Sequence, residues 1–213
     1  FEYRNSKSVP LNPLIMAFDL DDNIMPIAKE IAIVPISQNA LINTSPLVQI
    51  MPLFRDKGGI YHFADTISVF GEFGFAIKAI DKREGTKNIY QFHRIELIID
   101  NQLEFDLLYE RIPFNQGKFA KTLIQYDLKR ANLGEFQKLY RLIEHKKTSI
   151  HPSEKSGILG LSPGFHSVEI NIFDAHGNKT IVKGTIAGTF PMTLEATEIF
   201  RDNKVITLAL TPK

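Results

Sequence analysis

The chain has 213 residues, of which 44% are hydrophobic, and a formal net charge of +1. These values allow a sizeable core and argue against a nucleic-acid-binding domain, which usually carries a large basic excess. The sequence contains no cysteine, which excludes disulfide bonds and thiolate metal sites. No apolar run approaches the roughly 18–20 residues of a membrane helix, so we expect no membrane insertion and no signal peptide; a first residue of Phe1 suggests a piece of a longer protein.

The first half of the chain indicates a linker followed by β-strands. Residues 1–23 are polar and contain prolines, and the acidic stretch 19–23 is interpreted as a solvated turn because it lacks the D-x-D-x-D-G spacing of a calcium loop. Pro35 indicates a strand at a sheet edge, while Gly71 and Gly74 indicate a bulge or a close neighbour. Extended strands are predicted over residues 27–36, 47–54, 66–80, 89–100 and 103–114, and a turn at Asp100-Asn101 is predicted between the last two.

The most regular pattern in the chain, over residues 164–186, predicts a β-hairpin. Its turn is predicted over Asp174–Asn178, where Gly177 is expected to adopt a positive φ, and β-branched residues return over 179–186. The first strand alternates between a buried and an exposed face, with His166, Val168, Ile170 and Ile172 on one face and Ser167, Glu169 and Asn171 on the other.

Two strands share a short pattern that bears on the architecture. Residues 77–81 and 170–174 are both alternating segments that end in Asp before a loop with Gly. Two small sandwiches fit this repeat, and so does one sandwich in which these segments are the central strands of opposite sheets. The single sandwich is favoured, because about ten strands are too few for two seven-stranded units.

Residues 115–150 differ in character from the rest of the chain. Apolar residues at helix-like intervals, such as Phe136, Leu139 and Tyr140, predict a partly helical insertion, and basic residues exceed acidic ones by five. A solvated face is the favoured interpretation of these charges, and an anion-binding surface is the alternative. The candidate contact residues of that alternative are Lys118, Lys121, Lys129, Arg130, Lys138, Arg141, Lys146 and Lys147.

No pattern in the chain predicts catalysis or metal binding. Residues 160–164 match the G-x-S-x-G motif of a hydrolase nucleophile, but Pro163 has no N–H for an oxyanion hole and a strand rather than a helix follows. The histidines are interpreted as surface or half-buried side chains, since His166 and His176 lie at opposite ends of one strand and His93 alternates toward the core. We therefore expect no catalytic residue, no metal site and no cofactor in this chain.

Several segments occur in an order that is typical of one family. They are Asn12-Pro13-Leu14 with the acidic turn and Pro26-Ile27; Ile67-x-Val69-x-Gly71-x-x-Gly74-Phe75 with Asp81; Arg94 to Asn101; Ile158-Leu159; and Gly164-x-His166-x-Val168-x-Ile170-x-Ile172-x-Asp174-x-x-Gly177-Asn178. Together they resemble the β-sandwich region that follows the catalytic domain in lysostaphin/LytM-like zinc metallopeptidases of the Gram-negative envelope, which cut peptidoglycan cross-links. Asn101 stands where that family usually has Gly.

The resemblance implies a mainly β fold, an immunoglobulin-like antiparallel β-sandwich with a partly helical insertion. Its expected limits are residues 1–190, with an entering linker over 1–23 and the insertion at about 115–160. Residues 191–213 are expected to form the first strands of a following β module, because two further β-rich runs are separated by a turn signal there.

The same family takes its zinc ligands and catalytic residues from H-x-x-x-D and H-x-H segments, and no two histidines of this chain have the H-x-H spacing. The resemblance therefore implies a non-catalytic accessory module of a periplasmic cell-wall metalloendopeptidase, with zinc confined to a separate catalytic domain. Such a module would position the catalytic domain or contact peptidoglycan or the neighbouring peptidase domain. The alternatives are an immunoglobulin-like adhesion or surface module of an unrelated envelope protein, and an independent enzyme whose loops gather residues distant in sequence.

Overall fold

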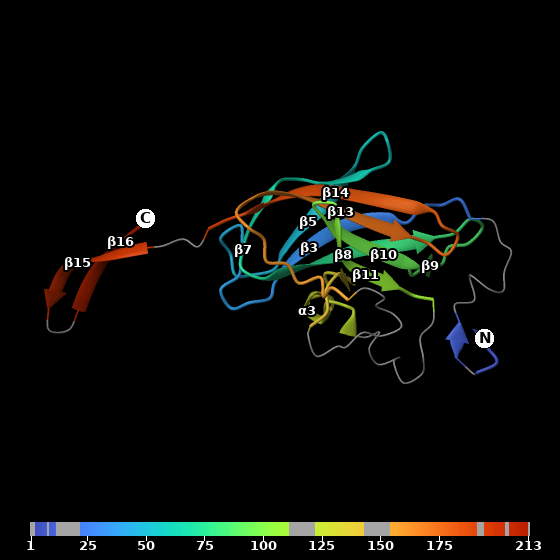
Figure 1. The fold of residues 1–213 in the computed structure, drawn as a ribbon, viewed down its shortest axis with the longest axis horizontal. Helices are drawn as coiled ribbons and strands as arrows, with labels where there is room; N and C mark the ends of the chain where they lie inside the picture. Colours follow the sequence, from blue (N-terminus) through green and yellow to red (C-terminus); the bar gives the residue numbers. More distant parts are fainter. Residues whose placement is uncertain are drawn as a thin grey trace.

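The computed structural model describes residues 3–7, 9–11, 22–110, 122–142, 154–190, 194–202 and 205–212, and these residues are mainly β, as predicted (Figure 1). The one helix described, α3 (Tyr126–Arg130), is short. The strands are β1 (Tyr3–Arg4), β2 (Pro10–Leu11), β3 (Ile27–Pro35), β4 (Leu41–Ile42), β5 (Gln49–Arg55), β6 (Tyr61–Phe63), β7 (Ile67–Phe70), β8 (Phe73–Lys82), β9 (Ile89–Tyr90), β10 (Arg94–Ile99), β11 (Gln102–Leu108), β12 (Gln137–Lys138), β13 (Gly164–Phe173), β14 (Lys179–Gly188), β15 (Leu194–Asp202) and β16 (Val205–Pro212).

Strands β3 to β14 form a single curled sheet of twelve strands, a half-barrel in shape (Figure 1). The main order is β11-β10-β13-β14-β6-β5-β3-β8-β12, with β4 paired to β7, β7 to β14, and β9 to β8. Strand β14 runs parallel to β6 and β7, so the sheet is mixed and not antiparallel throughout. The described strands therefore confirm the β class but do not form the two separate antiparallel sheets of an immunoglobulin-like sandwich.

Strand β5 explains why one sheet forms instead of two. Its first residues pair with β3, from Gln49 to Pro52, and its last residues pair with β6, from Leu53 to Arg55. A strand that changes partner along its length makes a corner, and the sheet curls there. The two halves of the sheet consequently remain hydrogen-bonded to each other at this corner.

Both halves of the sheet supply side chains to one main hydrophobic core. Strand β8 lies between β3 and β12 in one half, and β13 lies between β10 and β14 in the other. The predicted alternation in β13 is confirmed for Val168, Ile170 and Ile172, which are buried, but the exposed face was wrong at Asn171, which is only 3% exposed. Residues of this core on β8, β10 and β13 include Phe73, Phe75, Ile77, Ile95, Leu97, Val168, Ile170 and Ile172.

Two glycines and a proline have roles that differ in part from those predicted. Pro35 is the last residue of β3, an internal strand between β5 and β8, so the edge prediction was wrong; the missing N–H is tolerated at a strand end. Gly71, with φ of +74°, separates β7 from β8, so residues 66–80 are two strands and not one. The close neighbour predicted at Gly74 is the ring of Tyr140, which occupies the space that a Cβ would need.

The insertion contains much less helix than its spacing predicted. Helix α3 has five residues, and Phe136, Leu139 and Tyr140 lie in and around β12, which pairs with β8 at Ile77. Leu139 joins the main core, whereas Phe136 and Tyr140 pack in a second cluster on the other side of the sheet. Neighbouring residues that enter two different cores need the alternation of an extended chain, which one helix face cannot provide.

The hairpins that local turn signals predicted are all present. Gly177 adopts a φ of +89° between β13 and β14, and Asp100 and Asn101, both with positive φ, form the two-residue turn between β10 and β11. Near the ends of the chain, β1 pairs with β2 and β15 with β16, each as a separate two-stranded sheet.

In the part of the chain that is described, no helix is long and apolar enough to cross a membrane.

Candidate functional site

A group of acidic and imidazole side chains lies where β8 and β13 end. We call Asp22, Asp81, Asp174 and His176 the Asp22 cluster. Asp22 belongs to the segment that enters β3, Asp81 to the end of β8, and Asp174 and His176 to the turn after β13. One ligand atom from each of Asp22, Asp174 and His176 lies within 4.8 Å of the other two, which is a spacing that a metal ion can close.

Asp174 organises the turn from a buried position, with only 1% of its surface exposed. Its Oδ1 accepts the backbone N–H groups of His176 and Asn178, each at 2.8 Å, and its Oδ2 accepts the side-chain amide of Asn178 at 2.7 Å. This loop is an Asx-type turn closed by Gly177. The similar motifs of residues 77–81 and 170–174 end in Asp81 and Asp174, and the negative charge of Asp174 acts on Asp81.

The entering segment is held on this turn by two hydrogen bonds. The amide of Asn178 donates to the carbonyl of Asp22 at 2.8 Å across 156 residues of sequence, and the hydroxyl of Thr180 donates to the carbonyl of Pro26 at 2.5 Å. The Asp22 carboxylate accepts the N–H of Ile24 and lies 3.8 Å from Nδ1 of His176. Asp22 is 9% exposed, so the predicted solvated turn is wrong at this residue; residues 19–21 lie outside the described ranges.

Asp81 is the most strongly perturbed acid of the cluster. It is 4% exposed and follows Phe73, Phe75 and Ile77 on the core-facing side of β8. Its pKa is raised to about 7, first because burial penalises the charged carboxylate and then because Asp174 and Asp22 are negative; Lys82 N–H and Arg83 oppose this rise.

His93 adds a buried nitrogen next to the cluster. Its backbone N–H donates to the carbonyl of Phe173, the residue before Asp174, and the negative charge of Asp174 acts on its ring. Burial lowers the pKa of His93, which favours the neutral ring, and its Nδ1 is buried without a hydrogen-bond partner in the described structure. The sequence prediction that His93 faces the core is therefore confirmed.

The nominal nucleophile motif meets an Asp–His pair but does not form a catalytic triad. Nδ1 of His166 lies 2.6 Å from Oδ2 of Asp100, and Nε2 lies 2.8 Å from the backbone carbonyl of Ser162, not from its hydroxyl. A carbonyl accepts only, so Nε2 must carry a proton and cannot act as a base toward a nucleophile. Asp100 raises the pKa of His166, which favours the doubly protonated ring.

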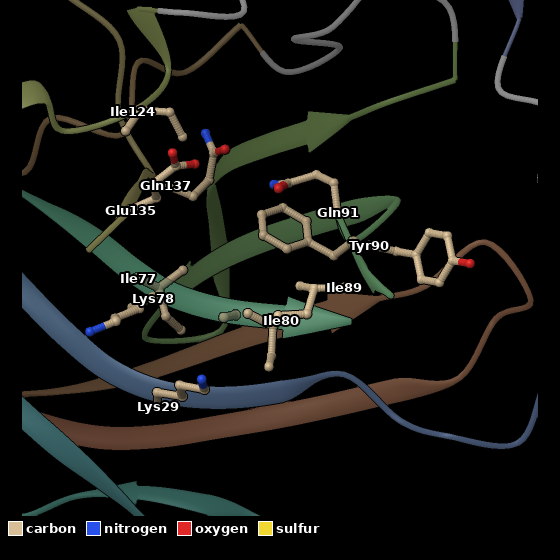
Figure 2. Close-up of a pocket in the computed structure, with 12 residues that line it drawn as sticks. Lys29, Ile77, Lys78, Ile80, Ile89, Tyr90, Gln91, Ile124, Glu135 and Gln137 are labelled. Carbon is tan, nitrogen blue, oxygen red and sulfur yellow. The ribbon is translucent and has the colours of Figure 1, made fainter. Parts of the chain in front are cut away.

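A pocket of about 250 Å³ lies between the insertion and the strands β8 and β9. Figure 2 shows Ile124, Glu135 and Gln137 on one side of it, and Ile89, Tyr90 and Gln91 on the other. Among the described residues, the lining carries no nucleophile with an adjacent base. The pocket therefore has a lining of mixed polarity and, among the described residues, no arranged catalytic pair.

Four of the eight candidate contact residues are described, and they have different surroundings. Lys129 pairs with Glu135 at 2.5 Å, and Arg130 is exposed in the last turn of α3. The Lys138 ammonium lies over the Tyr140 ring, and burial lowers its pKa. One guanidinium nitrogen of Arg141 donates to the Glu154 carbonyl at 2.8 Å. Residues Lys118, Lys121, Lys146 and Lys147 lie outside the described ranges.

The Asp22 cluster was missed by sequence reasoning because its members are far apart in the chain. The only local signal was the shared Asp at the ends of residues 77–81 and 170–174, and the spacing of histidine pairs could not indicate a site with one histidine.

Comparisons with protein-family models, curated proteins and solved structures found no match to this chain.

Proposed function

We propose that this chain is a non-catalytic accessory module of a cell-wall metalloendopeptidase of the bacterial envelope, and that it positions the segment entering at Asp22. The observation that carries the proposal is the attachment of this segment to the β13–β14 turn through Asn178 and Thr180. A segment held at two points on a sheet arrives in one direction only. The resemblance to the metallopeptidase family is part of this proposal, although the described strands form one mixed sheet and not the two antiparallel sheets of an immunoglobulin-like sandwich.

The residues of the motifs that resemble the metallopeptidase family have structural roles in this fold, which supports a non-catalytic accessory role. Asp100 and Asn101 make the β10–β11 turn, His166 ties that turn to Ser162, and Asp174 with Gly177 shapes the β13–β14 turn. In the described part of the chain these groups are used for architecture, and none is a nucleophile beside a base. A scaffold role is thus favoured over hydrolysis.

The basic insertion is proposed as the surface that meets acidic wall material or a neighbouring domain. Lys129 and Arg130 are the residues to test, since both are exposed at the end of α3, whereas Lys138 and Arg141 contact the body of the protein. Each exposed charge contributes only about 0.2–1 kcal/mol, and salt screens it over a Debye length of about 8 Å.

The catalytic part of the proposal is tested by incubating the purified chain with peptidoglycan, with and without Zn²⁺. We expect no release of soluble fragments in either condition. Release that a chelator abolishes would contradict the non-catalytic assignment. In the reading frame that contains this chain we also expect a domain with H-x-x-x-D and H-x-H segments, and a complete frame without one would contradict the accessory role.

The contact surface is tested by sedimentation with insoluble peptidoglycan. We expect weak binding at low salt that fades as salt is added and that falls when Lys129 and Arg130 are both changed to Glu. The matched control changes Lys57 and Lys87 to Glu, the same alteration of charge at exposed positions elsewhere. Equal losses in both variants would mean that net charge, and not this surface, governs binding.

A further inference from the structure

We propose that the pocket beside β8, between β12 and β9, binds a short extended peptide with a free carboxylate. The peptide pairs through its backbone with Ala79, and its carboxylate pairs with Lys29. This pocket has a volume of about 250 Å³ and is lined by both residues. Nothing in the accessory role uses it, so the ligand assigned here is additional to that role.

The edge of β8 that faces the pocket is paired at both ends but not in its middle. Strand β12 covers Ala76 and Ile77, and β9 covers Asp81 and Lys82. Residues 78–80 lie between them, and on this side none of the described strands lies opposite them (Figure 2). On its other side β8 pairs with β3 along the whole of this stretch. The pocket therefore opens onto a gap of three residues in the sheet edge.

The backbone of Ala79 points into this gap. Residues two apart in a strand direct their N–H and C=O groups to the same side. The C=O of Phe75 accepts the N–H of Leu139, just after β12, at 2.8 Å, and the N–H of Phe73 donates to the carbonyl of Leu159. Ala79 continues this series, and no turn or loop residue of the described chain bonds its N–H or C=O. A peptide that adds to a sheet edge uses this kind of donor and acceptor.

The gap has room for two or three residues of an occupant. Three residues of extended chain span about 10 Å, at about 3.3 Å per residue. A longer strand would meet β12 at Gln137 in one direction and β9 at Tyr90 in the other, and both residues line the pocket (Figure 2). The occupant is therefore a short peptide and not the middle of a long one.

Apolar side chains line the pocket beside the gap. Ile80 and Ile89 come from β8 and β9, and Ile124 comes from the insertion on the opposite side (Figure 2). Ile89 is 63% exposed although it lines a pocket. A peptide with small apolar side chains would remove part of this surface from water, which favours binding.

The charges of the pocket favour a carboxylate. Three charged residues line it, Lys29, Lys78 and Glu135. Lys78 pairs with Glu30 at 2.5 Å, and Glu135 pairs with Lys129 at 2.5 Å. Lys29 is exposed at the bulge of β3, and no ion pair within the described residues involves it. One ammonium group is thus left for an anionic end of the ligand.

Binding is measured on the full chain at pH 7 from the backbone amide signals of isotope-labelled protein, as acetyl-Ala-Ala-Ala is added. The acetyl group leaves the carboxylate as the only charge of this peptide. We expect a saturable shift of the Ala79 amide signal and slower exchange of its N–H, with a smaller change at Ile80, whose N–H faces β3. The same peptide with a C-terminal amide should bind about threefold more weakly, the size of effect that an exposed ion pair gives.

Two variants separate the ion pair from general charge. Lys29→Gln should weaken binding of the acid about threefold and leave binding of the amide unchanged, because both changes remove the same ion pair. The matched control is Lys57→Gln, which removes an exposed lysine in the turn between β5 and β6 and should bind the acid like the unmodified chain.

Three results would each overturn the inference. They are the absence of a saturable shift at Ala79, equal affinity for the acid and the amide, and equal losses of affinity in Lys29→Gln and Lys57→Gln. A shift at Ala79 together with both preferences supports it. The accessory role is tested separately, by peptidoglycan release and by the reading frame, so neither result decides the other.

Discussion

Strand β13 has an Asp–His pair near each end, and the two pairs differ in how much binding capacity they retain. At its start, both ring nitrogens of His166 are engaged, one by Asp100 at 2.6 Å and one by the Ser162 carbonyl at 2.8 Å. Beyond its end, His176 lies 3.8 Å from Asp22, whose side chain is 3% exposed, beside further buried carboxylates. The same residue types therefore give a closed surface link in one place and a candidate metal site in the other.

This difference teaches that unsatisfied capacity, and not residue identity, marks a candidate site. The start of β13 has the Gly-x-Ser-x-Gly motif, a histidine and an aspartate, yet its hydrogen bonds use every imidazole proton. The end of β13 has no recognised motif, yet it gathers two carboxylates, those of Asp22 and Asp174, around one histidine. Buried polar groups that lack partners are costly, so they indicate where a ligand or a proton belongs.

The largest expected effect that separates the two ends comes from Asp174. Asp174→Ala removes the acceptor of three hydrogen bonds in a buried turn, and we expect it to lower the free energy of unfolding by about 2–4 kcal/mol. Urea unfolding measures this loss. Asp174→Asn is the control, since it keeps one acceptor oxygen but not the charge, and it should cost less than Asp174→Ala. Equal costs would mean that the charge, and not the acceptor, shapes the turn.

The next effect concerns the backbone of the same turn. Gly177 has a φ of +89°, and a Cβ there would meet no atom within 4 Å, so Gly177→Ala should cost about 1 kcal/mol through backbone strain alone. Gly160→Ala is matched to it, because Gly160 is equally open but is not in the left-handed region. An unchanged urea midpoint for Gly177→Ala, equal to that of Gly160→Ala, would contradict the described turn.

A smaller effect, with a defined pH dependence, is expected at the start of β13. Asp100 raises the pKa of His166 above its unfolded value. The contribution of the protonated His166 to stability is therefore fully present below about pH 6.5 and is lost as pH rises through the folded pKa of His166. His166 in turn lowers the pKa of Asp100, so the contribution also falls at acid pH, through the folded pKa of that carboxyl. Asp100→Asn should therefore cost most between about pH 5 and 6, by about 0.2–1 kcal/mol for an exposed pair.

Thermal midpoints of the unmodified chain and Asp100→Asn at pH 5.5 and pH 9 measure this dependence. The two proteins should differ more at the lower pH. A difference that is the same at both values would show that the pair contributes through neutral hydrogen bonds alone, and the view of His166 as a doubly protonated ring would then fail.

The smallest expected effect is none at all. Ser162→Ala should leave any turnover of a chromogenic ester unchanged, because the carbonyl of Ser162 and not its hydroxyl faces His166, and Pro163 has no N–H to donate. A burst of product that requires the Ser162 hydroxyl would show a catalytic role at the start of β13 and would contradict the view that its groups only hold the fold. The fold control is the urea midpoint of the same variant.

Local signals in the sequence were sufficient for much of the secondary structure. The alternation in residues 164–186, the positive φ of Gly177 and the Asp100–Asn101 turn were all predicted, because strand faces and tight turns depend on neighbouring residues and backbone sterics. The helix expected around Phe136 was wrong because two different cores override a helix-like spacing. The edge position of Pro35 was wrong because strand order is not encoded locally.

By itself, then, the sequence determined the β class, the hairpins and the absence of a workable nucleophile in residues 160–164. Only the tertiary structure decided that one mixed sheet curls at β5, and that Asp22, Asp81 and Asp174 share one end of the core. The physical reason is range: turns and strand faces follow from interactions between neighbours, whereas Asn178 and Asp22 meet across 156 residues only when the whole sheet has closed around its core.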